Sequence, residues 1–204
     1  QTAGSLVRAR SAIVAIPPAL CERIAFDPPL PPTRAQLQQR VPHGSTIKVQ
    51  VVYDEPFWRR DGLSGQALDP SAPIAWTADN SPADGSCGVI VSFFEGRTAI
   101  RFSSMSVDDR RAAVVTTLGR HFGQKALAPQ AYHDLDWSAE VWTRGCYGGH
   151  FPPGVWTQFG PALREPVARI HWAGTETGTV WNGYMDGAVR SGERAAAEVA
   201  AELE

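Results

Sequence analysis

The chain has 204 residues, of which 43% are hydrophobic and 20% charged, and it contains 7 Trp and 8 Phe. These values are typical of a globular protein with one or two domains that buries a substantial core. The formal net charge is −2 and the sequence has no block of Lys or Arg, which argues against a surface for nucleic acid.

The number and spacing of the cysteines and the hydropathy of the chain bear on disulfides, metal sites and membrane helices. Cys21, Cys87 and Cys146 are odd in number and widely spaced, and they form no CxxC pair. This disfavours a disulfide scaffold or a zinc site and indicates a reducing compartment. No apolar run approaches the roughly 20 residues of a membrane helix. The sequence therefore predicts a soluble, cytoplasmic protein without a membrane anchor or a bound metal.

The first half of the chain reads mainly as strands. The first residue is Gln1, and a strand is predicted over 6–16, so we expect the sequence to be the later portion of something longer. Thr33 is a plausible N-cap for a short helix ending at Arg40. Further strands are predicted over 45–53, 72–78 and 87–94, and the Asp-Gly pair between the last two fits a hairpin turn.

The second half combines helices and strands. Ser106 begins a helix that runs to about residue 121, with Gly123 placed to end it. A strand is predicted over 131–137, a loop with one short helix over 149–166, a strand over 168–174 and a final helix over 183–203. Because strands and helices do not alternate regularly, the pattern favours an α+β fold.

Three features could have a chemical function, judged from the residue pattern alone. The strand, the Gly/Thr-rich loop and the helix of 171–204 would present backbone N–H groups at a helix N-terminus, either for a phosphate or cofactor or as a bare connection. Glu176 in that loop could bond a ribose hydroxyl or remain a solvated charge. Lys48 alternates with apolar residues on its strand; such a lysine usually faces solvent, and a buried one must be paired or functional.

The remaining candidates lie in glycine-rich loops. Cys146 in RGCYGGHFPPG is either a small buried hydrophobe or a reactive thiol, and His150 in the same loop is too little to indicate a thiol protease. Most aromatic residues are expected in the core. Tyr147 and Tyr184 differ because they stand in glycine-rich loops, where rings tend to line a pocket.

The blocks AIPPAL, FDPPLPPTRAQ, VPHGSTIKV, YDEPFW, RGCYGGHFPPG, TQFG and WAGTETGTVWNGYMDGAVRSGERAA together resemble the C-terminal portion of the flavin-containing amine oxidases, the monoamine oxidase family. The resemblance covers essentially the whole chain. It implies a mixed-sheet substrate-binding domain with helices over 21–140. Residues 1–20 and 141–204 would supply a strand, an FAD-contacting loop, and the last strand and helix of a Rossmann-like FAD domain whose N-terminal part is absent.

The resemblance also implies roles for individual residues. Lys48 matches a lysine that holds a water near the flavin, and Tyr147 and Tyr184 match an aromatic cage that guides the amine. Trp76 and Phe93 match positions lining the substrate cavity. Positions that match the family's FAD contacts are Trp137, Cys146, Gly174, Thr175, Glu176 and Met185. The cofactor is expected to be FAD, and the match at Cys146 favours a covalent thioether.

The implied reaction is oxidation of a primary amine to an imine and then an aldehyde, with O₂ reduced to H₂O₂. An N-terminal half or separate chain carrying G-x-G-x-x-G would complete the FAD site, and a homodimer is left open. Two alternatives remain. One is an L-amino-acid oxidase, for which Arg144 is the only cation near the cage residues in sequence. The other is a truncated, non-catalytic interaction module.

Overall fold

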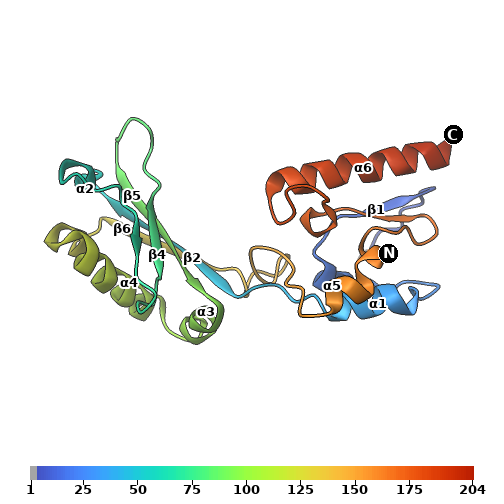
Figure 1. Ribbon diagram of the computed structural model, residues 1–204, viewed down its shortest axis with the longest axis horizontal. Coiled ribbons are helices and arrows are strands. Elements are labelled where there is room, and N and C mark those ends of the chain that lie inside the picture. Colours follow the sequence, from blue (N-terminus) through green and yellow to red (C-terminus); the bar gives the residue numbers. More distant parts are fainter. Residues whose placement is uncertain (1–3) are drawn as a thin grey trace. The chain divides into compact units, whose positions relative to one another are not determined.

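The computed structural model describes residues 4–204, which form two compact units (Figure 1). The first unit contains the described residues up to His43 together with residues 142–204, and the second contains residues 44–141. Residues 21–43, which the sequence assigns to a substrate domain, here belong to the first unit, because α1 (Pro32–Gln39) packs against η1 (Pro18–Arg23), α5 (Val155–Phe159) and η3 (Pro161–Leu163).

The first unit is built on two short parallel strands. β1 (Ala12–Val14) pairs with β7 (Ile170–Trp172), with Ile13 opposite His171. In Figure 1, α6 (Met185–Leu203) lies on one side of this pair and α1 on the other. The strand predicted over 6–16 is therefore much shorter in the structure, since β7 offers only three residues for pairing.

The second unit is a five-stranded sheet in the order β3-β4-β5-β2-β6, in which all neighbours are antiparallel. Its strands are β2 (Thr46–Tyr53), β3 (Ala67–Leu68), β4 (Trp76–Asp79), β5 (Gly88–Glu95) and β6 (Ala131–Asp136). The predicted mixture of helices and sheets is thus present. The strand predicted over 72–78 begins later, at Trp76, because the chain bends over residues 72–74.

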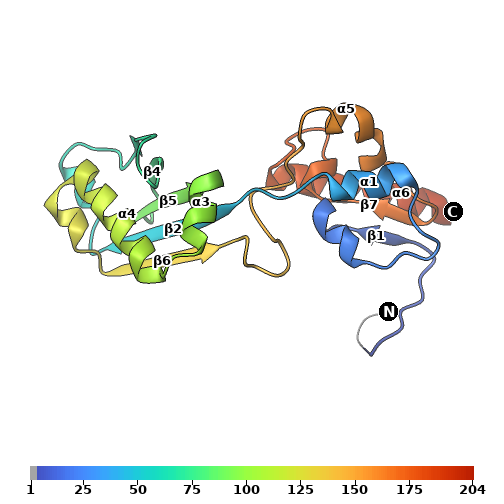
Figure 2. The ribbon, with the colours of Figure 1, turned by 90° about the horizontal axis from the view of Figure 1, so that it is seen from below.

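Helices cover one face of this sheet (Figure 2). They are α2 (Phe57–Arg60), α3 (Gly96–Ser103) and α4 (Val107–Phe122), followed by η2 (Gln124–Leu127). Val114 and Leu118 of α4 are fully buried in one cluster with Ile47, Val49 and Phe94 of the sheet. As predicted, Ser106 caps α4 by accepting the Asp109 N–H, and Gly123 ends it with a φ of 79°.

A buried ion pair fixes α4 on the sheet. The guanidinium of Arg110 contacts both oxygens of Asp134 on β6, at 2.6 and 3.0 Å, and also donates to the Met105 carbonyl at 2.8 Å.

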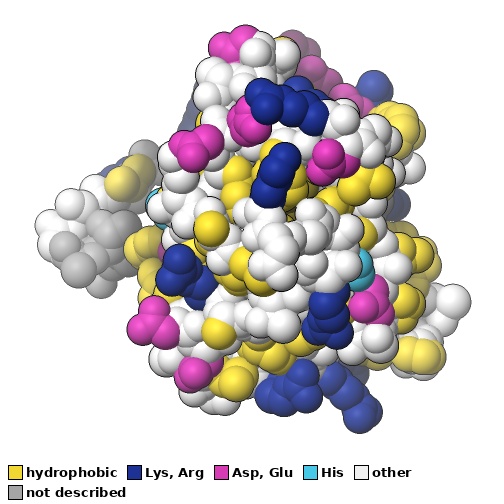
Figure 3. Space-filling view, turned by 90° about the vertical axis from the view of Figure 1, so that its left-hand side faces the viewer, with side chains coloured by type: hydrophobic (Ala, Val, Ile, Leu, Met, Phe, Trp, Pro, Cys, Tyr) yellow, Lys and Arg dark blue, Asp and Glu magenta, His cyan; other side chains and the backbone are white. Residues whose placement is uncertain are grey.

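The surface of the molecule carries charges of both signs. On the face seen in Figure 3, Lys and Arg side chains are interspersed with Asp and Glu. Across residues 4–204, no helix is both long and apolar enough to cross a membrane.

Candidate functional site

The face of the sheet opposite α4, hereafter the open face, carries the site residues predicted in the second unit. Along β2, Ile47, Val49 and Val51 enter the core, while the side chains between them point to the open face. Lys48 is among the latter and is half-buried rather than fully solvated. Its direct neighbours across the sheet are Phe93 on β5 and Leu135 on β6.

Aromatic rings lie beside Lys48. Trp76 and Phe93 are stacked, with ring centroids 5.8 Å apart and an angle of 16° between the planes. Trp137 follows β6, and its backbone N–H donates to the carbonyl of Thr46 at 3.1 Å. The open face thus combines one ammonium group with planar apolar surfaces.

Sequence reasoning missed two polar residues on the open face. Gln50 and His133 are cross-strand partners. Gln50 is two residues after Lys48 on β2 and therefore lies on the same face of the sheet. Together with Lys48, Asp134 and Leu135 they line a pocket of about 210 Å³. The register between β2 and β6 is the signal that locates them, and that register is not visible in either strand alone.

In the first unit, the loop after β7 contains Gly174, Thr175 and Glu176, and hydrogen bonds hold it against α6. The Gly174 N–H donates to the Ser191 hydroxyl at 2.9 Å, and the Thr175 hydroxyl donates to the Tyr184 carbonyl at 2.9 Å. Asn182 donates to the Glu176 carbonyl at 2.9 Å. Glycine is required at Gly174, where φ is 114°.

Glu176 is neither solvated nor extended away from the protein. It is 6% exposed, and its carboxylate accepts the Gly149 N–H at 2.9 Å. The Nε2 atom of His43 lies 3.6 Å from the same oxygen. Burial raises the pKa of Glu176, but His43 and the backbone N–H groups outweigh this effect, so that the net pKa is lowered and the carboxylate is ionised.

The two predicted cage tyrosines stand on loops that both contact the dipeptide Thr175–Glu176. Tyr147 lies two residues before Gly149, whose N–H bonds to Glu176, and the Tyr184 carbonyl accepts from Thr175. Both side chains are largely exposed, at 58% and 64%. The neighbouring Cys146 is half-buried.

The N-terminus of α6 offers donors for an acceptor-rich ligand such as a flavin. Tyr184 is the N-cap and provides no side-chain cap, so the first amides of this 19-residue helix face outward with the positive end of its dipole. Met185, the first helical residue, is 88% exposed. A Cβ at Gly187 would lie 2.1 Å from the Trp181 carbonyl oxygen, so glycine lets the preceding loop rest directly on the helix. The residues present therefore fit FAD.

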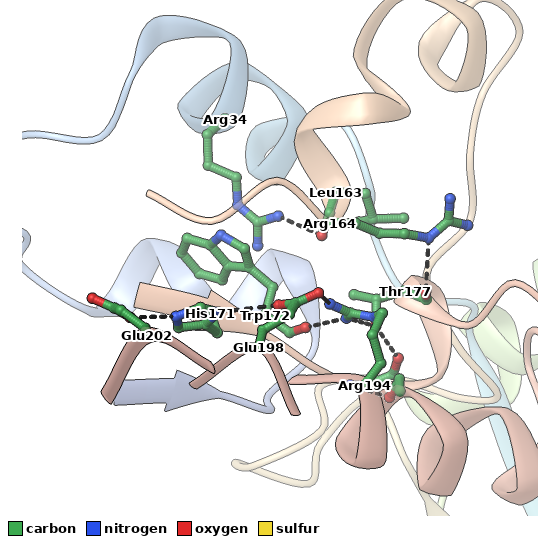
Figure 4. Close-up of polar contacts among 11 residues, drawn as sticks. Arg34, Leu163, Arg164, His171, Trp172, Thr177, Arg194, Glu198 and Glu202 are labelled. Atoms are coloured by element: carbon green, nitrogen blue, oxygen red, sulfur yellow. Dashed lines mark hydrogen bonds and ion pairs between the residues drawn. The ribbon is translucent and has the colours of Figure 1, made fainter. Parts of the chain in front are cut away.

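A polar network fixes α6 and α1 on opposite sides of β7 (Figure 4). His171 points to α6, where its ring nitrogens each lie 3.0 Å from a carboxylate oxygen, of Glu198 and of Glu202. Arg194 contacts Glu198 and donates to the Trp172 carbonyl. On the other side, Arg34 lies 3.5 Å from the centre of the Trp172 ring.

Arg34 also ties α1 to the segment before β7. Its guanidinium donates to the carbonyls of Ala162 and Leu163 at 2.8 and 3.0 Å. Burial lowers the pKa of Arg34 to about 10, which still leaves it charged at neutral pH.

Comparison with known proteins defines the class. Residues 1–200 match the family model described as flavin containing amine oxidoreductase. The chain is 48% identical over 185 residues to an L-amino acid dehydrogenase of Synechocystis, covering 91% of this chain and 39% of the relative. It is 44% identical over 196 residues to a probable flavin-containing monoamine oxidase A of Dictyostelium discoideum, covering 96% and 43%.

Solved structures of amine oxidases are similar to this chain. Cyclohexylamine oxidase from Brevibacterium oxydans superimposes with a TM-score of 0.95 at 37% identity, over 100% of this chain and 45% of that one. Putrescine oxidase bound to putrescine gives 0.91 at 38% identity, over 95% and 43%. The class is therefore the flavin-dependent oxidoreductases, whose cofactor here is FAD. Within it, the chain belongs to the flavin-containing amine oxidoreductase family and spans about two fifths of the length of these curated relatives.

The His171 cluster predicts a defined pH dependence of stability. Hydrogen bonds to Glu198 and Glu202 raise the pKa of His171 above 6.5. The pKa of Glu198 is lowered below 4.5 because His171 and Arg194 outweigh its partial burial, and His171 and Ser11 lower that of Glu202. The stabilisation is therefore full between about pH 4.5 and 6.5, is lost as pH rises through the raised His171 pKa, and is lost again as pH falls through the lowered Glu values.

Urea unfolding of the wild type and of His171→Phe from about pH 2 to pH 9 checks this expectation. The difference in the free energy of unfolding should be largest inside the window and shrink on both sides. A difference that stays constant with pH would contradict the charged-cluster account.

Proposed function

We propose that this chain is the C-terminal part of an FAD-dependent amine oxidase that oxidises a primary amine. The overall reaction is R–CH₂–NH₂ + O₂ → R–CH=NH + H₂O₂, and water then converts the imine to an aldehyde and ammonia. The observation that carries the proposal is the pair of exposed tyrosines on loops that meet beside the uncapped N-terminus of α6. Support comes from relatives named for amine oxidation.

The complete enzyme requires more chain than the residues present here. The parallel strands β1 and β7, with α6 on one side, are proposed to belong to a Rossmann-like FAD domain. The rest of that domain, with the G-x-G-x-x-G turn, would be supplied by an N-terminal portion or a separate polypeptide.

Individual residues would divide the work as follows. The redox chemistry would be supplied by bound FAD, as the acceptor of hydride from the substrate and the donor of electrons to O₂. The Gly174–Thr175 loop and the amides that begin α6 would hold it. The electron-rich faces of Tyr147 and Tyr184 would orient the amine nitrogen. Lys48 would hold a water by donating a hydrogen bond to it. The stacked pair Trp76 and Phe93 would exclude bulk water from the substrate.

A second candidate is oxidation of L-amino acids, because one relative at 48% identity is an L-amino acid dehydrogenase. Such a substrate needs a cation for its carboxylate. Arg144 is exposed, and its backbone has a positive φ of 58°, so it lies at the surface of the loop that carries Tyr147. The site residues described above supply rings rather than a guanidinium, which favours the amine.

The first test is a comparison of matched substrates. The protein is assembled in the presence of FAD and supplied with phenethylamine and with phenylalanine, which differ by one carboxylate, and its colour, H₂O₂ and O₂ consumption are recorded. We expect oxidation of the amine and little of the amino acid. The reverse preference would establish the second candidate, and colourless protein that stays folded and oxidises neither would favour a non-catalytic module.

The second test concerns the cage. Tyr184→Ala should lower kcat/KM for the amine by about tenfold or more while FAD content is unchanged, since an aromatic face contributes about 2 kcal/mol to a desolvated cation. Tyr184→Phe is the matched control and should retain most activity because the ring face is kept. Equal kinetics in the wild type and Tyr184→Ala would exclude Tyr184 from the amine path.

The third test concerns covalent attachment. A thioether at Cys146 would form with loss of the thiol proton and one ring-methyl hydrogen, and O₂ would take up the two electrons. Acid-denatured wild-type protein should then carry the mass of FAD on the peptide that contains Cys146, and Cys146→Ala should release all flavin. An unmodified peptide from the yellow wild-type protein would mean that FAD is bound without a covalent bond.

A further inference from the structure

We propose that Glu176, together with His43, is a positioning residue that sets the spacing between the two tyrosine-bearing loops. The contacts of Glu176 with Gly149 and His43, and of Thr175 with Tyr184, are called the bracket. They do not depend on any ligand. Its consequence for catalysis rests on the function proposed above, in which both tyrosines orient the amine.

Two consecutive residues each hold one of the loops. The Thr175 hydroxyl donates to the carbonyl of Tyr184, and the Glu176 carboxylate accepts the N–H of Gly149, two residues beyond Tyr147. Because Thr175 and Glu176 are adjacent in a single turn of η4 (Thr175–Thr177), the relative placement of the two loops is determined by one short rigid element.

The loop of Tyr147 lies against Glu176 without spare room. A Cβ at Gly149 would stand 2.5 Å from Val41 and 3.2 Å from the Glu176 side chain. A Cβ at Gly148 would stand 3.3 Å from the carboxylate oxygen. A side chain at Gly149 would clash with Val41, and one at Gly148 would crowd the carboxylate, so the two glycines allow the backbone to lie directly against Glu176.

His43 completes the bracket from a third segment. It forms an antiparallel bridge with Gly149, and the next N–H, of His150, donates to the Pro42 carbonyl at 2.7 Å. The His43 side chain is only 5% exposed, and among the described residues its ring nitrogens have no hydrogen bond. Its Nε2 atom lies 3.6 Å from an oxygen of the Glu176 carboxylate. A buried carboxylate is costly unless it is paired, so His43 and Glu176 stabilise each other.

The experiment uses the assembled oxidase and limited trypsin digestion, which reports on the loop independently of turnover. Arg144 is exposed and lies three residues before Tyr147, so cleavage after Arg144 measures opening of that loop. Glu176→Ala should be cleaved there at least about tenfold faster than wild type, because a hydrogen bond to a charged group is lost. Glu176→Gln keeps an acceptor oxygen and should be much less affected. Glu165→Ala, at an exposed position in the same unit, is the matched control.

A double-variant comparison tests the role of His43. His43→Leu leaves the buried Glu176 carboxylate with the Gly149 N–H but without the imidazole beside it, so cleavage should be faster than in the combined His43→Leu, Glu176→Gln protein. Strictly additive effects would overturn the pairing. Far-UV circular dichroism on every variant separates loop opening from global unfolding, and Glu176→Gln keeps the test decisive if Glu176→Ala does not fold.

Kinetics then separate this inference from the proposed function. Glu176→Ala with full FAD content should lose kcat/KM for the amine, and Glu176→Gln should restore most of it. Unchanged cleavage after Arg144 together with normal amine oxidation would overturn the bracket alone. If Glu176→Ala is cleaved faster but the FAD-containing wild type itself oxidises no amine, the bracket is retained and the proposed function is rejected.

Discussion

The arrangement of the first unit depends on one constraint, the parallel pairing of β1 with β7. Parallel strands cannot be joined by a tight turn, and both of their faces must be covered. Here the connection contains the whole second unit, and the two faces are covered through adjacent residues: His171 bonds to α6, while Trp172 packs under Arg34 of α1. Three segments that are far apart in the sequence are therefore held together by a strand of three residues.

The position of the candidate cofactor loop follows from this pairing. In sheets of parallel strands, ligands bind beyond the carboxyl ends of the strands. The Gly174–Glu176 loop leaves β7 at that end and is tied at once to α6 through Ser191 and Tyr184. The open face of the second unit depends instead on the alternation of β2, which buries Ile47 and Val49 and turns Lys48 to the other side.

Local sequence predicted the elements whose signals are local. The strands β2 and β5, and α4 with Ser106 and Gly123 at its ends, form as predicted because alternation and capping act within a few residues. The helix expected to be capped by Thr33 begins instead at Pro32, where the fixed φ of proline suits the first turn. α3 was missed because its eight residues follow β5 without a break, at Gly96 with a φ of 54°. Glu176 was named both from the loop pattern and by resemblance, but its contact with Gly149 joins residues 27 positions apart, and no local pattern encodes that contact.

The second unit begins and ends on adjacent strands, since Ile47 on β2 lies opposite Asp136 on β6. An insertion whose two ends are neighbours adds little loop-closure entropy to the fold that receives it. In evolutionary terms, the sheet can exchange residues on its open face, or lengthen its hairpins, while the parallel pair and its covering helices stay unchanged. Changes in the sheet and retention of the parallel pair are then largely independent, because they act on different stretches of one chain.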